Sequence, residues 1–535
     1  MNLLTEHLAI WTGADNEKKS GRGRASGSAA SVYGVKKLRE LILELAVRGK
    51  LVPQDANDEP ASELLKRIAA EKEKLIKEGK IKAQKPLAVI GDDEKPFELP
   101  KGWMLARLQD VFDVRDGTHD TPKYCDTGFP LITSKNLYTG TLDFSDVKNI
   151  SEEDHLKIKD RSEVHRGDIL FAMIGSIGNP VIVNTDIEFS IKNVALFKPY
   201  SSRYCDMNYL LKYLLIASVD MRKRASGAVQ SFVSLGLIRE SIFPLPPIAE
   251  QHRIVAKVDE LMTLCDQLEN QHSNAIVAHE KLVSYLLNTL TQSQDAAEFN
   301  ESWQRIAANF DTLFSTETSI DALKQTVLQL AVMGKLVPQN VSDEPASELL
   351  KRIQAEKAKL IAEGKIKKDK PLAVIGDDEK PFALPNGWEW ARLNNVLDVR
   401  DGTHDSPKDA EGDDTYPLVT SKNFSNGEIN FDEARKISAV DHFEISKRSR
   451  VERFDILFSM IGGNIGNQVL VNDEREFSIK NVALFKYYDR NYTSPFFIKK
   501  FLEHLAIDLQ TQAAGNEVIA SRATVVRLGD AFVIE

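Results

Sequence analysis

The strongest constraint on this sequence is that it repeats itself. Residues 45–103, which begin LAVRGKLVPQ, return as residues 330–388, which begin LAVMGKLVPQ, at an offset of 285 positions. VRDGTHDTPK (114–123) is matched at the same offset by VRDGTHDSPK (399–408). The repeated stretch of roughly 200 residues is far longer than the period of about 20–50 residues found in solenoids. The sequence therefore predicts two complete modules in tandem.

Each module begins with a pattern typical of helices. Leu38, Leu41 and Leu45 recur at steps of three and four residues, and the charged run that follows ends at Gly79. Because the second copy has the same pattern, we expect helical regions at 36–80 and 321–363.

Beyond Trp103, and again beyond Trp388, short β-rich runs are broken by Gly, Asn and Asp. This order predicts an α+β fold in which two mixed, strand-dominated domains are separated by long antiparallel, coiled-coil-like helices. The duplication adds the expectation of a pseudo-twofold internal repeat.

The segment between the modules predicts a long spacer helix. Residues 249–292 contain neither proline nor glycine, and at a rise of about 1.5 Å per residue they would form a rod of about 65 Å. Its natural partner is 321–363, in an antiparallel hairpin; packing of the seam on a neighbouring domain is the alternative, since periodicity does not separate the two. The apolar seam consists of Val255, Val258, Leu261, Met262, Cys265, Leu268, Ile276, Leu282 and Leu286.

Composition and motifs exclude several classes of protein. The net charge of −10 argues against nonspecific coating of nucleic acid, which depends on many Lys and Arg side chains. Cys125, Cys205 and Cys265 lack the spacing of a zinc site or a disulfide framework. GxxxxGK[ST], GxGxxG, HExxH and GxSxG are all absent. No run predicts a membrane span, and the N-terminus lacks the features of a signal peptide, so a cytoplasmic protein is expected.

Polar loops of the β-rich domains are the candidate binding site. Their residue types donate hydrogen bonds to phosphates and base edges in protein–DNA complexes. Short basic clusters at 221–227 and 447–453 could add contacts to a nucleic-acid backbone. The predicted DNA-binding residues are Thr118, His119, Lys123, Ser134, Lys135, Asn136, Lys192 and Asn193 in the first domain, and Thr403, His404, Lys408, Ser421, Lys422, Asn423, Lys480 and Asn481 in the second.

His119 with Asp116 and Asp120 offers a competing interpretation as a general base or a metal corner. Loop Asp and His residues beside a glycine more often stabilise a turn, and two binding domains share a scaffold more readily than two active sites do. We therefore expect no catalytic residue, cofactor site or metal site in this chain.

The chain resembles the specificity subunit of type I restriction–modification systems. The resemblance rests on LRELILELAVRGKLVPQDANDEPASELLKRIAAEKEKL, on its repeat at 323–360, on PLPPIAEQHRIVAKVDELM (244–262), and on GDILFAMIGSIGNPVIV and DGTHDTPKY in the variable domains. It implies that each target recognition domain reads one half of a bipartite, double-stranded DNA sequence. It also implies docking of two methyltransferase subunits and of restriction/translocase subunits. S-adenosylmethionine, ATP and Mg would be bound by those partners.

The expected division of the chain follows from the repeat and the resemblance. It comprises an N-terminal helix and flexible linker (1–34), a helical conserved region (35–95), a target recognition domain (96–247), a long spacer helix (248–295), a connector with the second helical region (296–380) and a second recognition domain (381–535).

The second module departs from the first at its end. The run RASGAVQSFVSLGLIRESIFPLPPIAEQHRIV has no full counterpart, so we expect the distal helix to be missing and the seam of Leu38, Leu41 and Leu45 to be left unpaired. Two rival functions stay open: a protein-only scaffold of the complex made inactive by C-terminal truncation, and a self-sufficient methyltransferase or nuclease.

Overall fold

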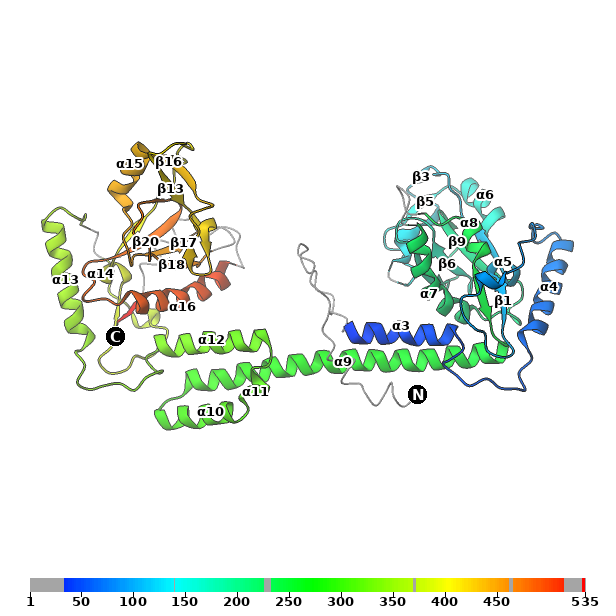
Figure 1. Cartoon of the computed structure of the whole chain (residues 1–535), viewed down its shortest axis with the longest axis horizontal. Helices are drawn as coiled ribbons and strands as arrows, with labels where there is room; N and C mark the ends of the chain where they lie inside the picture. Colours follow the sequence, from blue (N-terminus) through cyan, green and yellow to red (C-terminus); the bar gives the residue numbers. More distant parts are fainter. Residues whose placement is uncertain are drawn as a thin grey trace. The chain divides into compact units, whose positions relative to one another are not determined.

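The computed structural model describes residues 33–138, 140–225, 232–368, 372–460, 465–513 and 532–534 (Figure 1). The chain divides into two compact units, Met1–Ile276 and Val277–Glu535. The helix and linker expected at 1–34 lie almost entirely outside the described residues. Within the described ranges, no helix is long and apolar enough to cross a membrane.

The first unit opens with the helices α3 (Tyr33–Val47) and α4 (Ala61–Lys77). The chain turns after α3 at Gly49, whose φ of +67° costs glycine no steric strain. Pro60 occupies the N-cap of α4, with Glu63 in the first turn and Lys77 in the last, and this order of charges suits the helix dipole.

α3 packs on the part of α9 (Ile248–Gln292) that belongs to the same unit. Leu38 and Ile42 share one buried core with Val258 and Leu261 of α9. At the edge of this contact Arg39 Nη2 donates to carboxylate oxygens of Asp266 at 2.7 Å and Glu269 at 2.9 Å.

The expectation that the seam of Leu38, Leu41 and Leu45 stays unpaired is therefore wrong for Leu38 and Leu45. Leu38 is 4% exposed, and Leu45 packs against the same core from a partly buried position. The sequence pattern identified an apolar face correctly, but periodicity carries no information about which helix covers it.

The β-rich domain of the first unit combines two four-stranded sheets, ordered β2-β9-β6-β7 and β3-β5-β4-β8, with a separate β1-β10 pair. Helices α5 (Leu108–Val111), α6 (Glu152–Ser162), α7 (Met207–Ala225) and α8 (Leu235–Glu240) accompany them, as do the 3-10 turns η1 (Asp92–Glu94) and η2 (Ser134–Leu137). The strands are β1 (Met104–Arg107), β2 (Phe112–Asp116), β3 (Tyr124–Cys125), β4 (Phe129–Ile132), β5 (Lys148–Ile150), β6 (Ile169–Ala172), β7 (Gly178–Ile182), β8 (Ser190–Ile191), β9 (Val194–Pro199) and β10 (Ile242–Leu245).

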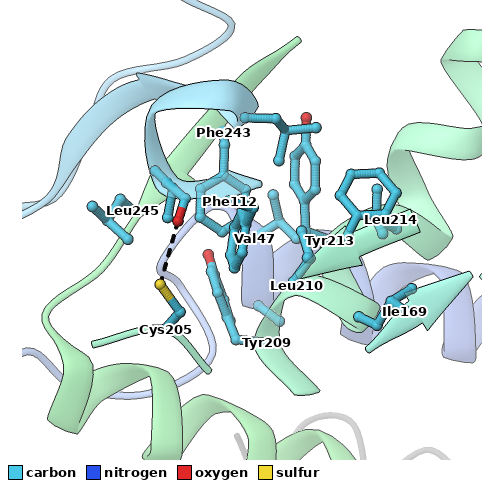
Figure 2. Close-up of a cluster of buried hydrophobic side chains, with 14 of the residues drawn as sticks. Val47, Phe112, Ile169, Cys205, Tyr209, Leu210, Tyr213, Leu214, Phe243 and Leu245 are labelled. Carbon is cyan, nitrogen blue, oxygen red and sulfur yellow. Dashed lines mark hydrogen bonds between the residues drawn. The ribbon is translucent and has the colours of Figure 1, made fainter. Parts of the chain in front are cut away.

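Aromatic rings fill the core of this domain (Figure 2). The ring of Phe243 lies edge-on to Phe112, with centroids 5.4 Å apart, and to Tyr213, at 5.0 Å. Tyr209 Oη donates to the Pro244 carbonyl at 3.1 Å, so the buried hydroxyl is satisfied. Cys205 Sγ donates to the Val111 carbonyl at 3.3 Å, and burial raises the pKa of this thiol to about 12. Cys205 is therefore a packing residue with little thiolate character.

The second unit repeats this plan. Its sheets are ordered β12-β20-β17-β18, β16-β13-β19, β14-β15 and β11-β21. Its helices and turns are α10 (Ala296–Ala308), α11 (Phe310–Leu313), α12 (Glu317–Val332), α13 (Ala346–Ala362), η3 (Asp377–Glu379), α14 (Leu393–Val396), η4 (Ser421–Asn423), α15 (Ala439–Ser449) and α16 (Pro495–Ala513). Its strands are β11 (Glu389–Ala391), β12 (Leu397–Asp401), β13 (Thr415–Val419), β14 (Phe424–Ser425), β15 (Glu428–Ile429), β16 (Arg435–Ser438), β17 (Ile456–Ser459), β18 (Gln468–Leu470), β19 (Ser478–Ile479), β20 (Val482–Tyr487) and β21 (Phe532–Ile534).

The long helix expected at 249–292 is present as α9, but its expected partner is only partly right. The C-terminal end of α9 packs through Val283, Leu287 and Leu290 on α10, α11 and α12, whereas α13 packs on α14. Lys335, just after α12, donates to the Thr291 carbonyl at 2.8 Å, so α12 runs in the same direction as this end of α9 and not antiparallel to it.

The predicted seam is also wrong along part of α9. Ile276 and Leu282 are 47% and 50% exposed, while Val283 and Leu287 are buried instead. The early seam residues Val258, Leu261 and Cys265 are buried as expected. A change of partner along one continuous helix shifts the buried face, and a single periodic pattern does not represent that shift.

Ile42 and Val327 occupy equivalent positions in the two copies of the repeat, and together they test the α3–α9 contact. Ile42 is 1% exposed and Val327 is 39% exposed. Ile42→Ala is expected to lower the free energy of opening of α3 by about 2–4 kcal/mol, because it leaves a cavity in the core. Val327→Ala is expected to lower that of α12 by less than about 1 kcal/mol. Hydrogen exchange of peptides from the two helices measures both, and equal losses would contradict the assignment.

Candidate nucleic-acid interface

A backbone crossing organises the candidate site of each β-rich domain. In the first domain the loop after β2 runs beside the turn between β8 and β9: Thr118 N–H donates to the Ile191 carbonyl and Asn193 N–H donates to the Thr118 carbonyl, both at 3.0 Å. The second domain repeats these bonds, from Thr403 N–H to the Ile479 carbonyl at 3.0 Å and from Asn481 N–H to the Thr403 carbonyl at 3.1 Å. The structure thus brings Thr118, His119, Lys192 and Asn193 together, along with their copies.

The crossing explains why glycine and asparagine occupy two of its positions. A Cβ placed on Gly117 would lie 2.1 Å from the Ile191 carbonyl oxygen, and one on Gly402 would lie 2.7 Å from that of Ile479. Asn193 and Asn481 have φ values of 53° and 54°, in the left-handed region that asparagine tolerates better than most residues.

The histidine of each loop is held at both ring nitrogens. His119 Nδ1 lies 2.9 Å from Asn193 Oδ1, and Nε2 lies 2.9 Å from Asp116 Oδ2. In the second domain the corresponding distances are 2.9 Å from His404 Nδ1 to Asn481 Oδ1 and 2.7 Å from Nε2 to Asp401 Oδ2. With both nitrogens engaged, these rings position the loop, and neither is free to act as a general base.

The pKa of His404 is raised above its ordinary value. The main favourable cause is the hydrogen bond with Asn481, and the Asp401 carboxylate adds to it, while partial burial and the Arg448 charge act in the opposite direction. The environment therefore favours a positively charged ring in this loop.

The only difference between VRDGTHDTPK and VRDGTHDSPK preserves a hydroxyl group. Lys192 Nζ donates to Thr121 Oγ1, and Lys480 Nζ donates to Ser406 Oγ. Thr and Ser serve equally as acceptors here, so each loop is tied to the following lysine in the same way.

Asn136 and Asn423, which the sequence placed among the DNA-binding candidates, are buried in the structure. Each is 5% exposed. Asn136 Oδ1 accepts from Thr133 N–H at 2.9 Å, and its Nδ2 donates to the Asp143 carbonyl at 3.0 Å; Asn423 Oδ1 accepts from Thr420 N–H at 2.9 Å. These amides close a turn and face away from solvent, which leaves them no surface to offer a base.

The neighbouring lysines are different. Lys123, Lys135, Lys408 and Lys422 are exposed, and within the described residues no hydrogen bond or ion pair engages their ammonium groups. Ser134 and Ser421 sit beside Lys135 and Lys422 in η2 and η4 as half-buried residues. Each domain therefore presents two uncommitted cations next to its crossing.

The two basic clusters are largely engaged within their own domains. Arg450 forms an ion pair with Glu476 at 3.2 Å, and Arg448 Nη2 donates to the Asp401 carbonyl at 3.0 Å. Arg222 Nε donates to the Ser218 carbonyl at 3.1 Å, while residues 226 and 227 lie outside the described residues.

Sequence reasoning missed Arg161, whose guanidinium is bound to Asp116 Oδ1 beneath the first loop. The available signal was the repeated Arg-Ser pair at the end of α6 and α15, Arg161-Ser162 and Arg448-Ser449. Among the described residues, no group of three or more His, Cys, Asp or Glu side chains could hold a metal ion.

Gly117→Ala tests the crossing directly. We expect it to destabilise the first β-rich domain by about 1–3 kcal/mol, because the added methyl group forces two backbone segments apart. Gly236→Ala is the matched control, since its nearest neighbouring atom would be Ser234 Oγ at 3.8 Å. Thermal unfolding of the full chain measures both, and a wild-type midpoint for Gly117→Ala would refute the close approach.

Comparison with known proteins matches the sequence of this chain to a family. Residues 100–278 match the family model described as the type I restriction modification DNA specificity domain. The EcoAI specificity subunit of Escherichia coli is 48% identical over 75% of this chain and 68% of its own length. The EcoEI specificity subunit of the same organism is 46% identical over 74% of this chain and 67% of its own length.

Among solved structures, the HsdS subunit of Thermoanaerobacter tengcongensis aligns with 82% of this chain and 86% of its own chain, at 17% identity and a TM-score of 0.39. The assignment rests on the two sequence relatives. The chain belongs to the family of type I restriction enzyme specificity subunits, which are non-catalytic components that recognise DNA.

Proposed function

We propose that each β-rich domain reads one half of a bipartite double-stranded DNA target through the loops around its backbone crossing. The recognition domains are those expected at 96–247 and 381–535. The observation that carries the proposal is that both domains hold the same crossing and place beside it exposed lysines that have no partner within the described parts of the chain. Lysines of this kind bind phosphates, and a shared frame would approach both half-sites in the same way.

The helical regions expected at 35–95, 248–295 and 296–380 would set the gap between the half-sites and dock methyltransferase and restriction subunits. Support comes from the antiparallel, coiled-coil-like contact of α3 with α9: Arg39 reaches Glu269, while Gln54, beyond the end of α3, reaches Glu250 near the start of α9 at 3.1 Å. The duplication of the sequence supports a pseudo-twofold relation. S-adenosylmethionine, ATP and Mg would be bound by the partner subunits and not by this chain. The complex would act in the cytoplasm.

Base discrimination requires residues that differ between the domains, because a shared residue cannot distinguish two half-sites. The segment after Lys123 forms strand β3 in the first domain, where Tyr124 is 53% exposed. In the second domain the corresponding chain holds Ala410, whose N–H donates to the Lys436 carbonyl at 3.0 Å.

A second difference follows the 3-10 turns. In the first domain this segment exposes Tyr138, whereas the second forms a β14-β15 hairpin around Asn426 and Gly427, with φ values of 50° and 78°. We infer that 124–128 and 137–143 read the first half-site, and that 409–415 and 424–430 read the second.

The scaffold alternative is not favoured, because the relatives are specificity subunits. A protein that binds only protein would have no sequence preference at all. The DNA experiments below separate these two outcomes.

An exchange of loops tests which segments read bases. Replacing 409–415 and 424–430 with 124–128 and 137–143 is expected to give the second domain the base preference of the first, because the underlying frame is shared. The measurement is selection of binding duplexes from a random-sequence pool by the chain assembled with its methyltransferase subunit. An unchanged second half-site would show that base reading lies elsewhere.

Charge removal tests the phosphate contacts. Lys123→Ala and Lys408→Ala are each expected to weaken binding of the selected duplex and to reduce the salt slope of log K by about 1, without changing the selected sequence. Lys500→Ala is the control, since Lys500 lies on α16 and pairs with Glu503 at 2.7 Å. An altered sequence preference would mean that these lysines contact bases.

A further inference from the structure

The two nearly identical loops differ in how their aspartate is neutralised. In the first domain Asp116 is bound by Arg161 at Oδ1 and by His119 at Oδ2. In the second domain Arg448 donates instead to the backbone carbonyls of Asp401 and Gly402, and its Nη2 lies 4.0 Å from Asp401 Oδ2. Asp401 Oδ1 is buried and has no hydrogen-bond partner among the described residues.

His404 is consequently the cation that directly binds the Asp401 carboxylate. Its two ring nitrogens face Asp401 Oδ2 and Asn481 Oδ1, and both of these oxygens only accept hydrogen bonds. The ring can donate to both only when it carries two protons. Asn481 in turn follows Lys480 and bonds the Thr403 carbonyl, so the doubly protonated ring joins the loop to the turn that carries this lysine.

We propose that His404 is a positioning residue whose charged ring holds the 402–408 loop against the 480–481 turn. The second domain then binds DNA more weakly as pH rises, whereas binding by the first domain does not change. This inference rests on the proposed function. The first domain is the internal reference: His119 makes the same two contacts, but Asp116 is also bound by Arg161, which keeps its charge throughout the physiological range, so this carboxylate retains a charged partner when the ring is neutral.

The sign of the effect follows from the charges around the ring. Asp401 faces it from β12, Arg448 from α15, and Asn481, next to Lys480, from the β19–β20 turn. The pKa of His404 is raised in this setting. Both hydrogen bonds of the ring, to Asp401 and Asn481, are therefore present at low pH, and one of them is lost as pH rises through the raised pKa. Loss of the proton removes one of the two donated hydrogen bonds and leaves Asp401 without a charged partner at hydrogen-bond distance.

The experiment is a footprint of the full chain assembled with its methyltransferase subunit, on a duplex selected from a random-sequence pool at about pH 6. The half-site weakened by Lys408→Ala is assigned to the second domain. At about pH 8.5 we expect this half-site to need about tenfold more protein for half-protection, and the other to change by less than about twofold.

Three variants isolate the histidine. His404→Arg keeps a permanent cation with several donors, and it should abolish the pH response while retaining protection. His404→Gln should weaken the second half-site at both pH values. His165→Gln, an exposed residue between α6 and β6 whose Nδ1 lies 2.9 Å from Lys198 Nζ and not at the crossing, should behave as wild type.

The results that overturn the inference are distinct from failure of the proposed function. Equal pH responses at the two half-sites, or an unchanged response in His404→Arg, would refute the role of His404 while leaving DNA reading intact. Absence of two protected patches at about pH 6 would refute the proposed function itself, and with it the inference.

Discussion

The backbone crossing at Gly117 and Gly402 is the constraint on which the rest of each recognition domain depends. It brings the loop after one strand within hydrogen-bond distance of a turn that follows another, more than seventy residues further along the chain. Only glycine fits at positions 117 and 402 without displacing the Ile191 or Ile479 carbonyl. Asparagine in the left-handed region completes the turn on the other side of the crossing. Placement of the histidine, the paired hydroxyl and the flanking lysines follows from this one contact.

The crossing also explains why ten residues are repeated almost without change. The glycine permits the approach of the two segments, the aspartate binds the histidine, the histidine contacts the asparagine of the turn, and the hydroxyl accepts a hydrogen bond from a lysine. These structural roles are common to both domains, so the repeated loop is a frame, and the flanking segments that differ are free to recognise different bases. The difference between Arg161 and Arg448 shows that a nearly identical loop can still have a different electrostatic environment.

Much of the fold was predictable because it depends on local pattern. The run without proline or glycine predicted α9, and the offset between the copies predicted two domains of the same plan. The elements that pack on each helix were not predictable, because an apolar helical face indicates only that it is buried and not which element buries it. Leu38 is covered by α9 itself, and α9 changes its buried face where its neighbours change. In the site, the sequence named His119 and Lys192 as candidates, and the structure places their two loops side by side. The sequence did not reveal that the Asn136 amide is hydrogen-bonded within its own turn, or that Arg161 reaches Asp116 from α6, because both contacts depend on tertiary structure.

We propose that this chain reads two separate half-sites, one with each domain. Sequencing of modified bases in genomic DNA from the organism that carries this chain tests it most directly, because methylation by the assembled enzyme records the recognised sequence. The account predicts one recurrent motif made of two short specified blocks separated by a fixed stretch of unspecified bases. A single continuous motif would contradict it.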